Sequence, residues 1–244
     1  MFTYEYYKKI LIALKNNGYI FADYHNWKDS DKCVILRHDI DMSLERAVKL
    51  AELEGNFGIQ STFFVLLTSD FYNVFSKRSS VLIKRIMDEG HKIGLHFDES
   101  CYPEINGNVD LMRARIRSEV DVLEQAIQCK CGVVSMHRPT KELLDADIQF
   151  DGVINSYGKT FFKDFKYLSD SRRNWKEPID KIICSGKYKR LHVLTHAFWY
   201  GTVERDIHDT IMEFVNSANS ERYIFVSENI TDINSIMNKN EVLS

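Results

Sequence analysis

The chain has 244 residues, of which 44% are hydrophobic, and this is enough apolar material to bury one sizeable core. The formal net charge of -3, with basic residues scattered along the chain, argues against a nucleic-acid partner, because such proteins normally carry a basic field. No uninterrupted apolar segment approaches membrane-spanning length, so we expect no integral membrane segment.

The N-terminal part has neither a basic leader followed by an apolar run nor a small-residue cleavage site, which favours a cytoplasmic location. A first helix is expected around residues 4–16, before any strand. We therefore expect residues 1–30 to form an N-terminal helical cap on a single domain that spans 1–244. The five cysteines, an odd number at irregular spacing, are expected to be reduced thiols.

After this cap, short apolar or β-branched runs alternate with segments of helical periodicity. Seven or eight strands with helices between them predict an α/β fold, a single distorted (β/α) barrel of about seven parallel strands. The predicted strands cover residues 33–36, 59–67, 91–97, 132–137, 152–157, 190–196 and 222–227. The predicted helices include residues 43–55, 79–90 and 109–127, with Ser43 as the N-cap of the first.

Ionisable residues follow several of the predicted strands. A buried charge is costly unless it is paired or bound to a metal, so such residues mark candidate functional positions. Because the carboxyl ends of parallel strands meet at one edge of a sheet, we expect these side chains to lie close together. They are Arg37, His38, Asp39 and Asp41 after the first run, then His96, His137, Arg138, and His196, while the tract 167–175 adds Asp170 and Trp175.

Each of these residues also has an ordinary structural interpretation. Asp41 could simply cap the helix that follows it. His96, taken alone, is more often a hydrogen-bonded core histidine than a ligand, and Trp175 and Trp199 could be plain apolar packing. Their succession at consecutive strand ends favours one shared site over several independent structural roles.

In this order the residues resemble the polysaccharide deacetylase superfamily, which is the NodB-homology or carbohydrate esterase family four group. The resemblance runs from about residue 34 to residue 196 and is strongest to the subgroup with an "RHDxD" first motif, which is associated with surface-polysaccharide loci. It implies a NodB-type barrel. From "RHDID" it assigns the catalytic base to Asp39 and a metal ligand to Asp41, and from "GHKIGLH" it assigns a second metal ligand to His96.

The later motifs of the superfamily are similar to segments in the second half of the chain. From an Arg-Pro pair the resemblance assigns to Arg138 the role of holding the base carboxylate. A further motif contains both Asp170, which would brace that arginine, and Trp175, which would form one wall of the site. A Leu-x-His motif implies that Leu194 lines the acyl pocket and that His196 acts as the general acid.

Two departures from the superfamily pattern affect the metal site. The two aspartates of the first motif are usually adjacent, whereas Ile40 separates them here, and a further histidine usually found four residues after the first is replaced by Ser100. The third protein ligand is therefore open, although a hydrolytic zinc site uses about three protein ligands and one open position. The candidates, in order of preference, are His137, Asp98 and His38.

Together with these residues, the resemblance implies hydrolysis of an N-acyl (acetamido) group on a sugar of a surface-glycan precursor, with a divalent metal, zinc, as cofactor and an N-acylated carbohydrate as substrate. An amide is a poor electrophile, so its hydrolysis at neutral pH calls for a metal and for acid–base groups. The aromatic side chains of Trp175 and Trp199 could serve as sugar platforms. Two alternatives stay open: a non-catalytic glycan-binding or scaffold protein with a degenerate site, and a deformylase or other amidohydrolase of the same fold. The oligomeric state is not predicted.

Overall fold

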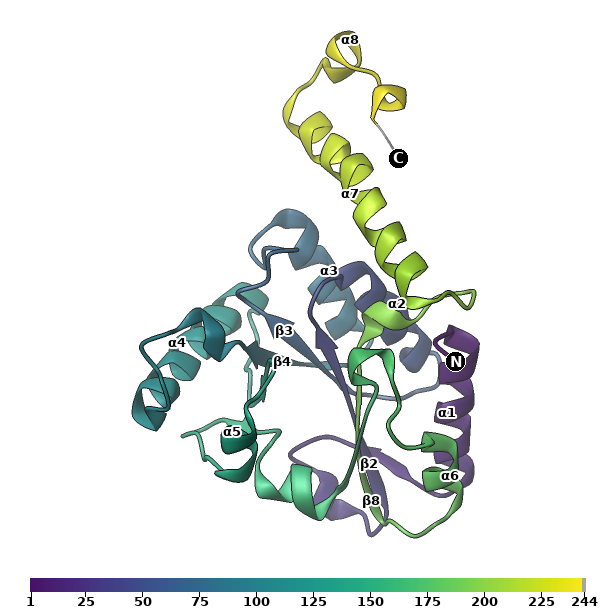
Figure 1. Ribbon diagram of the computed structural model, residues 1–244, viewed down its shortest axis with the longest axis vertical. Helices are drawn as coiled ribbons and strands as arrows, with labels where there is room; N and C mark the ends of the chain where they lie inside the picture. Colours follow the sequence, from purple (N-terminus) through teal and green to yellow (C-terminus); the bar gives the residue numbers. More distant parts are fainter. Residues whose placement is uncertain (243–244) are drawn as a thin grey trace.

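The computed structural model describes residues 1–242 and is built around a curved parallel sheet (Figure 1). Its strand order is β6-β5-β4-β3-β2-β8-β7, with β1 paired to β2, and all these pairs are parallel. The predicted α/β class, with seven parallel strands along one path, is confirmed. The strands are β1 (Ile20–Ala22), β2 (Cys33–Ile40), β3 (Thr62–Leu66), β4 (Lys92–Phe97), β5 (Val133–Met136), β6 (Ile154–Asn155), β7 (Lys166–Ser169) and β8 (Arg190–Thr195).

The barrel is open on one side. The path of strands begins at β6 and ends at β7, and within residues 1–242 no ladder joins these two strands. β6 has only two residues, so it offers few hydrogen bonds to a neighbour. The distortion that we expected for the barrel therefore takes the form of an incomplete closure.

β2 lies inside the sheet and carries the first group of ionisable residues. All eight of its residues are buried, and it pairs with both β3 and β8. In the register with β8, His38 lies opposite Thr195. Because side chains alternate along a strand, Arg37 and Asp39 share one face of the sheet and His38 points to the other.

Helices surround the sheet (Figure 1). The predicted N-cap is confirmed, since the Ser43 side chain accepts a hydrogen bond from the amide of Arg46. The helices of the body are α1 (Tyr4–Asn16), α2 (Leu44–Gly55), α3 (Lys77–Asp88), α4 (Val109–Ile127), α5 (Lys141–Asp145) and α6 (Ile179–Cys184). Short 3-10 turns lie at Trp27–Asp29, Glu99–Cys101, Ser171–Arg173, Ala197–Trp199 and Lys239–Glu241, and a π turn lies at Thr160–Asp164.

A buried polar network occupies the face of β2 opposite to Asp39. His38 Nδ1 lies 2.6 Å from the hydroxyl of Thr195 and its Nε2 lies 2.9 Å from Glu54 of α2. Glu54 also accepts hydrogen bonds from Tyr7 of α1 and from Ser61. Burial alone would raise the pKa of Glu54, but His38, His91 and Ser61 together outweigh this effect and lower that pKa. The network joins α1 and α2 to β2, which carries Asp39, and to β8, which His196 follows.

Two predicted segments differ from the structure. The N-terminal residues 1–30 contain the expected helix α1, but they also contain β1, so this segment is not a purely helical cap. Residues 222–227, predicted as a strand from their β-branched and aromatic side chains, lie inside the helix α7 (Ile207–Asn229). There Tyr223 donates a hydrogen bond to Asn234 beyond the helix, a tertiary contact that a local pattern does not show.

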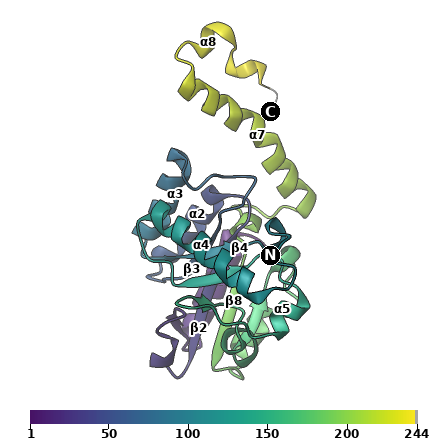
Figure 2. The same ribbon diagram turned by 90° about the vertical axis from the view of Figure 1, so that its left-hand side faces the viewer.

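α7 and α8 (Ile233–Ile236) extend away from the sheet (Figures 1 and 2). The single domain predicted over 1–244 ends in residues 243–244, which lie outside the described residues. Within the described chain, no helix combines the length and the apolar character that crossing a membrane requires. All five cysteines are free, as predicted.

Candidate active site

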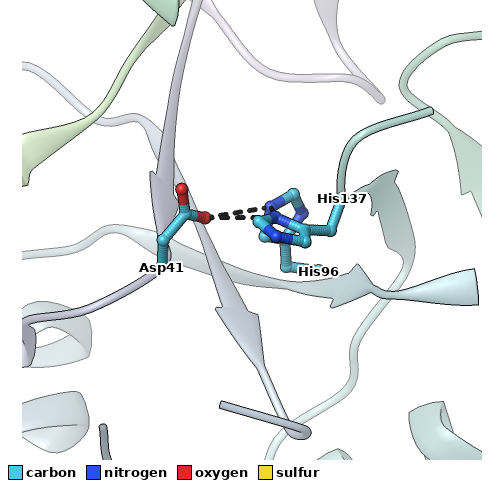
Figure 3. A group of neighbouring side chains, drawn as sticks. All are labelled: Asp41, His96 and His137. Atoms are coloured by element: carbon cyan, nitrogen blue, oxygen red, sulfur yellow. Dashed lines mark hydrogen bonds and ion pairs between the residues drawn. The ribbon is translucent and has the colours of Figure 1, made fainter. Parts of the chain in front are cut away.

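The carboxyl ends of β2, β4, β5 and β8 bring ionisable residues to one edge of the sheet. Figure 3 shows Asp41, which follows β2, facing His96 of β4 and His137, which follows β5. Asp41 Oδ1 lies 3.3 Å from His96 Nε2 and 3.5 Å from His137 Nδ1, and these two nitrogens lie 3.1 Å apart. The structure thus brings together the three residues that the sequence analysis assigned to a metal.

These three side chains fit a divalent cation. Asp41 Oδ1 is buried and has no hydrogen-bond partner within residues 1–242, and one donor atom from each residue lies within 4.8 Å of the others. Burial alone would raise the pKa of Asp41, but His137 and His96 outweigh it and hold that pKa well below its usual range, so the carboxylate is ionised. One carboxylate and two imidazoles form a donor set typical of zinc.

The other candidates for the third ligand lie outside this cluster. Asp98 accepts hydrogen bonds from the amide and the hydroxyl of Ser100, at 3.0 and 2.7 Å, and so caps the turn that follows β4. His38 points to the opposite face of β2, where both of its nitrogens have partners. Among the three candidates, only His137 joins Asp41 and His96.

Asp39 is held by an arginine of its own strand. Arg37 Nε donates to Asp39 Oδ1 at 2.9 Å and Arg37 Nη2 donates to Oδ2 at 2.8 Å, so the pair is bidentate and buried. The guanidinium also donates to the hydroxyls of Ser135, Ser156 and Tyr157. Burial by itself would raise the pKa of Asp39, but the effect of Arg37 is opposite and the net shift is downward.

The expected contact between Arg138 and Asp39 is wrong. Arg138 is exposed, with a left-handed backbone (φ of 48°), and it makes no ion pair or hydrogen bond within the described chain. Both oxygens of Asp39 already accept from Arg37. In the sequence, Arg37 was only one of several candidate ionisable residues. Its i, i+2 spacing to Asp39 places both side chains on one face of a strand and could have indicated this pair.

His196 and Asp170 form a second pair beside the cluster. His196 Nδ1 lies 2.6 Å from Asp170 Oδ1, and the backbone amide of His196 donates to both oxygens of Asp170 at 3.1 Å. Burial lowers the pKa of His196, but the carboxylates of Asp170, Asp39 and Asp41 together outweigh burial and raise the pKa to about 9. Its Nε2 faces Asp41 Oδ2 at 4.0 Å. Asp170 therefore braces His196, and the expected contact between Asp170 and Arg138 is not present among the described residues.

The residues expected to bind substrate are largely covered. Leu194, near the end of β8, is 1% exposed, and Trp175 is 9% exposed with an indole nitrogen that has no partner within residues 1–242. Trp199 is partly buried and packs edge-on against Phe198. Of these three side chains, Trp199 offers the most surface to a ligand.

The chain is similar to several solved structures at low sequence identity. One is a CE4 esterase from Streptococcus mutans, with a TM-score of 0.49 and 18% identity over 70% of this chain and 76% of that chain. Another is the peptidoglycan deacetylase PdaC from Bacillus subtilis, with a TM-score of 0.45 and 16% identity over 70% of this chain and 77% of that chain. A third is a CE4 family pseudoenzyme from Bacillus anthracis, with a TM-score of 0.41 and 15% identity over 69% of this chain and 56% of that chain.

No family model matches the chain, and no curated protein matches it. The likenesses to solved structures are distant, and they include both active proteins and a pseudoenzyme. The chemistry that this site can perform therefore follows from its own side chains, which combine a candidate cation site, a separately held carboxylate and a braced histidine.

Proposed function

We propose that the protein is a metal-dependent hydrolase that removes an N-acyl (acetamido) group from a sugar. One observation carries the proposal: Asp41, His96 and His137 converge, while Asp39 stands beside them without belonging to their cluster, its Oδ2 being 3.6 Å from His96 Nε2. A cation site next to a carboxylate held by a different partner is the arrangement that metal-assisted hydrolysis requires.

Asp41, His96 and His137 would hold the divalent ion, for which zinc is the best fit to one carboxylate and two imidazoles. When bound, such an ion supplies a Lewis acid for the acyl oxygen and lowers the pKa of a water molecule. His137 comes from the strand after the one that carries His96, so the three residues depend on the packing of β2, β4 and β5.

Asp39 would act as the general base. Arg37 fills one lone-pair site on each oxygen of Asp39, and a carboxylate has about four such sites, so acceptor capacity remains on the side facing His96. Because Arg37 keeps the carboxylate ionised and fixes its orientation, Asp39 can take a proton from water without swinging into the cation site.

His196 would act as the general acid. The Asp170 carboxylate binds its Nδ1 and keeps the ring protonated near neutral pH, which leaves Nε2 to deliver a proton to the departing nitrogen. His196 follows β8 and Asp39 lies in β2, two adjacent parallel strands, so the acid and the base reach the same edge of the sheet.

For the substrate, we propose a sugar of a surface-glycan precursor that is processed in the cytoplasm. The motif resemblance supports the sugar and the glycan class. Trp199, which is partly exposed and whose backbone amide donates to the carbonyl of His196 at 3.1 Å, is the side chain on which a sugar ring would stack.

The proposal is tested with Asp39→Asn and Asp41→Ala in parallel, using an N-acetylated oligosaccharide and elemental analysis of the purified protein. Asp39→Asn should retain zinc and lose about 10²–10⁴-fold in kcat, as expected when a general base is removed. Asp41→Ala and His96→Ala should lose both zinc and turnover. Unchanged turnover in Asp39→Asn would refute the assignment.

A protein that purifies without metal, binds the acetylated saccharide and releases no acetate even with added zinc would instead be a glycan-binding protein. The exposed Arg138 provides the control, because it makes no contact in the site: Arg138→Met should keep both zinc and kcat.

A further inference from the structure

Asp41 lies just beyond the end of β2, where its backbone is outside the ladder with β3. The register of these two strands ends at the pair of Ile40 and Val65, and β2 itself ends at Ile40. Asp39 is different, because it lies inside the ladder and is bound by Arg37 of its own strand. A metal ligand must be held within about 0.5 Å of its productive position. The position of Asp41 therefore depends on contacts from outside the ladder.

The loop after β3 supplies such a contact. Residues 67–76, which we name the β3 loop, connect β3 to α3. The Tyr72 hydroxyl donates to the carbonyl of Ile40 at 2.6 Å and accepts from the amide of Leu66 at 2.9 Å. It thus bridges the last residue of β2 and the last residue of β3. Leu66 in turn pairs with His96 of β4, so this hydroxyl lies between the two strand ends that lead to the cation cluster.

The β3 loop makes a second contact, to Asp41 itself. Ser69 Oγ donates to the backbone carbonyl of Asp41 at 3.1 Å and accepts from the amide of Phe71 at 3.2 Å. The amide of Ser69 donates to the carbonyl of Leu66 at 3.3 Å, which closes the turn that follows β3. Two consecutive carbonyls, those of Ile40 and Asp41, are therefore each bound by a side-chain hydroxyl of the same short loop.

The β3 loop is itself fixed to the rest of the chain. Val74 is buried and belongs to the main hydrophobic core. The ring of Phe71 packs edge-on against Phe214 of α7, with centroids 5.4 Å apart. At the end of the loop, the Ser76 side chain accepts from the amide of Ser79 and so caps α3. Because a group can position a neighbour only when it is held in place, this anchoring lets the two hydroxyls fix the chain around Asp41.

We propose that Tyr72 and Ser69 are positioning residues, which hold the backbone of Asp41 so that its carboxylate points at the two imidazoles of the cation cluster. Neither side chain belongs to that cluster, and each acts through main-chain carbonyls. The residue that separates the two aspartates, Ile40, is the one whose carbonyl Tyr72 binds. The inference rests on the proposed function, because it concerns the affinity of the cluster for zinc.

Zinc dissociation constants, measured by competition with a chromophoric chelator, test this proposal. Tyr72→Phe and Ser69→Ala should each raise the constant at least about tenfold, because partners that orient a metal ligand typically contribute this much to affinity. Ser69→Thr keeps the hydroxyl and should bind zinc as the wild type does.

Tyr19→Phe is the matched control for Tyr72→Phe. The Tyr19 hydroxyl also donates to a backbone carbonyl, that of Tyr188, at 2.5 Å. These two residues precede β1 and β8, so they lie at the amino ends of the parallel strands, away from the cation cluster. Tyr19→Phe should therefore have the zinc dissociation constant of the wild type.

Urea titrations of the metal-free proteins separate positioning from a purely structural role. Both tyrosine variants should have lower urea midpoints, since each leaves a carbonyl without its donor, but only Tyr72→Phe should bind zinc more weakly. If Tyr72→Phe does not fold, the comparison of Ser69→Ala with Ser69→Thr decides.

Three results would overturn the inference while leaving the proposed function in place. They are wild-type zinc affinity in Tyr72→Phe and Ser69→Ala, equal weakening in Tyr72→Phe and Tyr19→Phe, and affinity in Ser69→Thr as low as in Ser69→Ala. A wild-type chain that binds no zinc would overturn the proposed function and this inference with it.

Discussion

The two charges of the Arg37–Asp39 pair are buried together, at 0% and 4% exposure, so each depends on the other. Removing one partner of a buried ion pair leaves an uncompensated charge, which costs about 3–5 kcal/mol. Arg37→Met should therefore lower the free energy of unfolding by this amount in urea titrations. Arg138→Met, at an exposed position, should stay within about 0.5 kcal/mol of the wild type. Equal losses in the two variants would contradict the pairing seen here.

The Asp170–His196 contact makes a residue-scale prediction of a different kind. Asp170→Asn keeps the size of the side chain but replaces the charged acceptor at His196 Nδ1 with a neutral amide. Since the proposed acid then loses both its orientation and its counter-charge, kcat should fall at least about tenfold while the zinc content stays at the wild-type level. A loss of zinc in this variant would assign Asp170 to the cation site instead.

At the scale of elements, α4 carries a carboxyl group that makes stability depend on pH. Glu119 is buried, accepts a hydrogen bond from Tyr102, and leaves its Oε2 without a partner in the described chain. Burial raises its pKa from 4.5 to about 7. Between these values the folded chain binds a proton more tightly than the unfolded chain does, so the free energy of unfolding should fall as pH rises from 4.5 to 7.

The size of this effect is at most about 3–4 kcal/mol, since the pKa rises from 4.5 to about 7 and one pKa unit corresponds to about 1.4 kcal/mol. Glu119→Gln, which stays neutral at every pH, should remove this part of the pH dependence. Urea midpoints measured for both proteins across the same pH range decide the matter, and parallel curves would show that Glu119 is ionised in the folded state.

At the scale of the whole molecule, the cation site links three strands that are far apart in sequence. A ligand that binds only the folded chain stabilises it, by about 2.7 kcal/mol at a concentration one hundred times its dissociation constant. For a chain of this length zinc should then raise the thermal midpoint by about 5–10 °C. His96→Ala should abolish the increase, whereas Arg138→Met should retain it. A midpoint that does not respond to zinc in the wild type would argue against the site.

Periodicity along the chain was sufficient to predict the alternation of strands and helices, the Ser43 cap and the span of α4, because these features depend on neighbours within a few residues. The same local reasoning misassigned residues 222–227, whose β-branched and aromatic side chains suit a strand equally well. In the structure they continue a helix that begins at Ile207 and is joined to α8 through Tyr223.

By itself the sequence indicated that ionisable residues would collect at one edge of a parallel sheet, and this pattern together with the motif resemblance selected Asp39, Asp41, His96, His137 and His196, but also Arg138, which is exposed. Only the tertiary structure decided which of them touch. The contact between His196 and Asp170 depends on the direction of side chains from different strands, whereas the contact between Arg37 and Asp39 lies within β2 and follows from their i, i+2 spacing. Spacing along a chain determines the face on which a side chain lies, but the distance between two strands follows from how the whole sheet curves and packs.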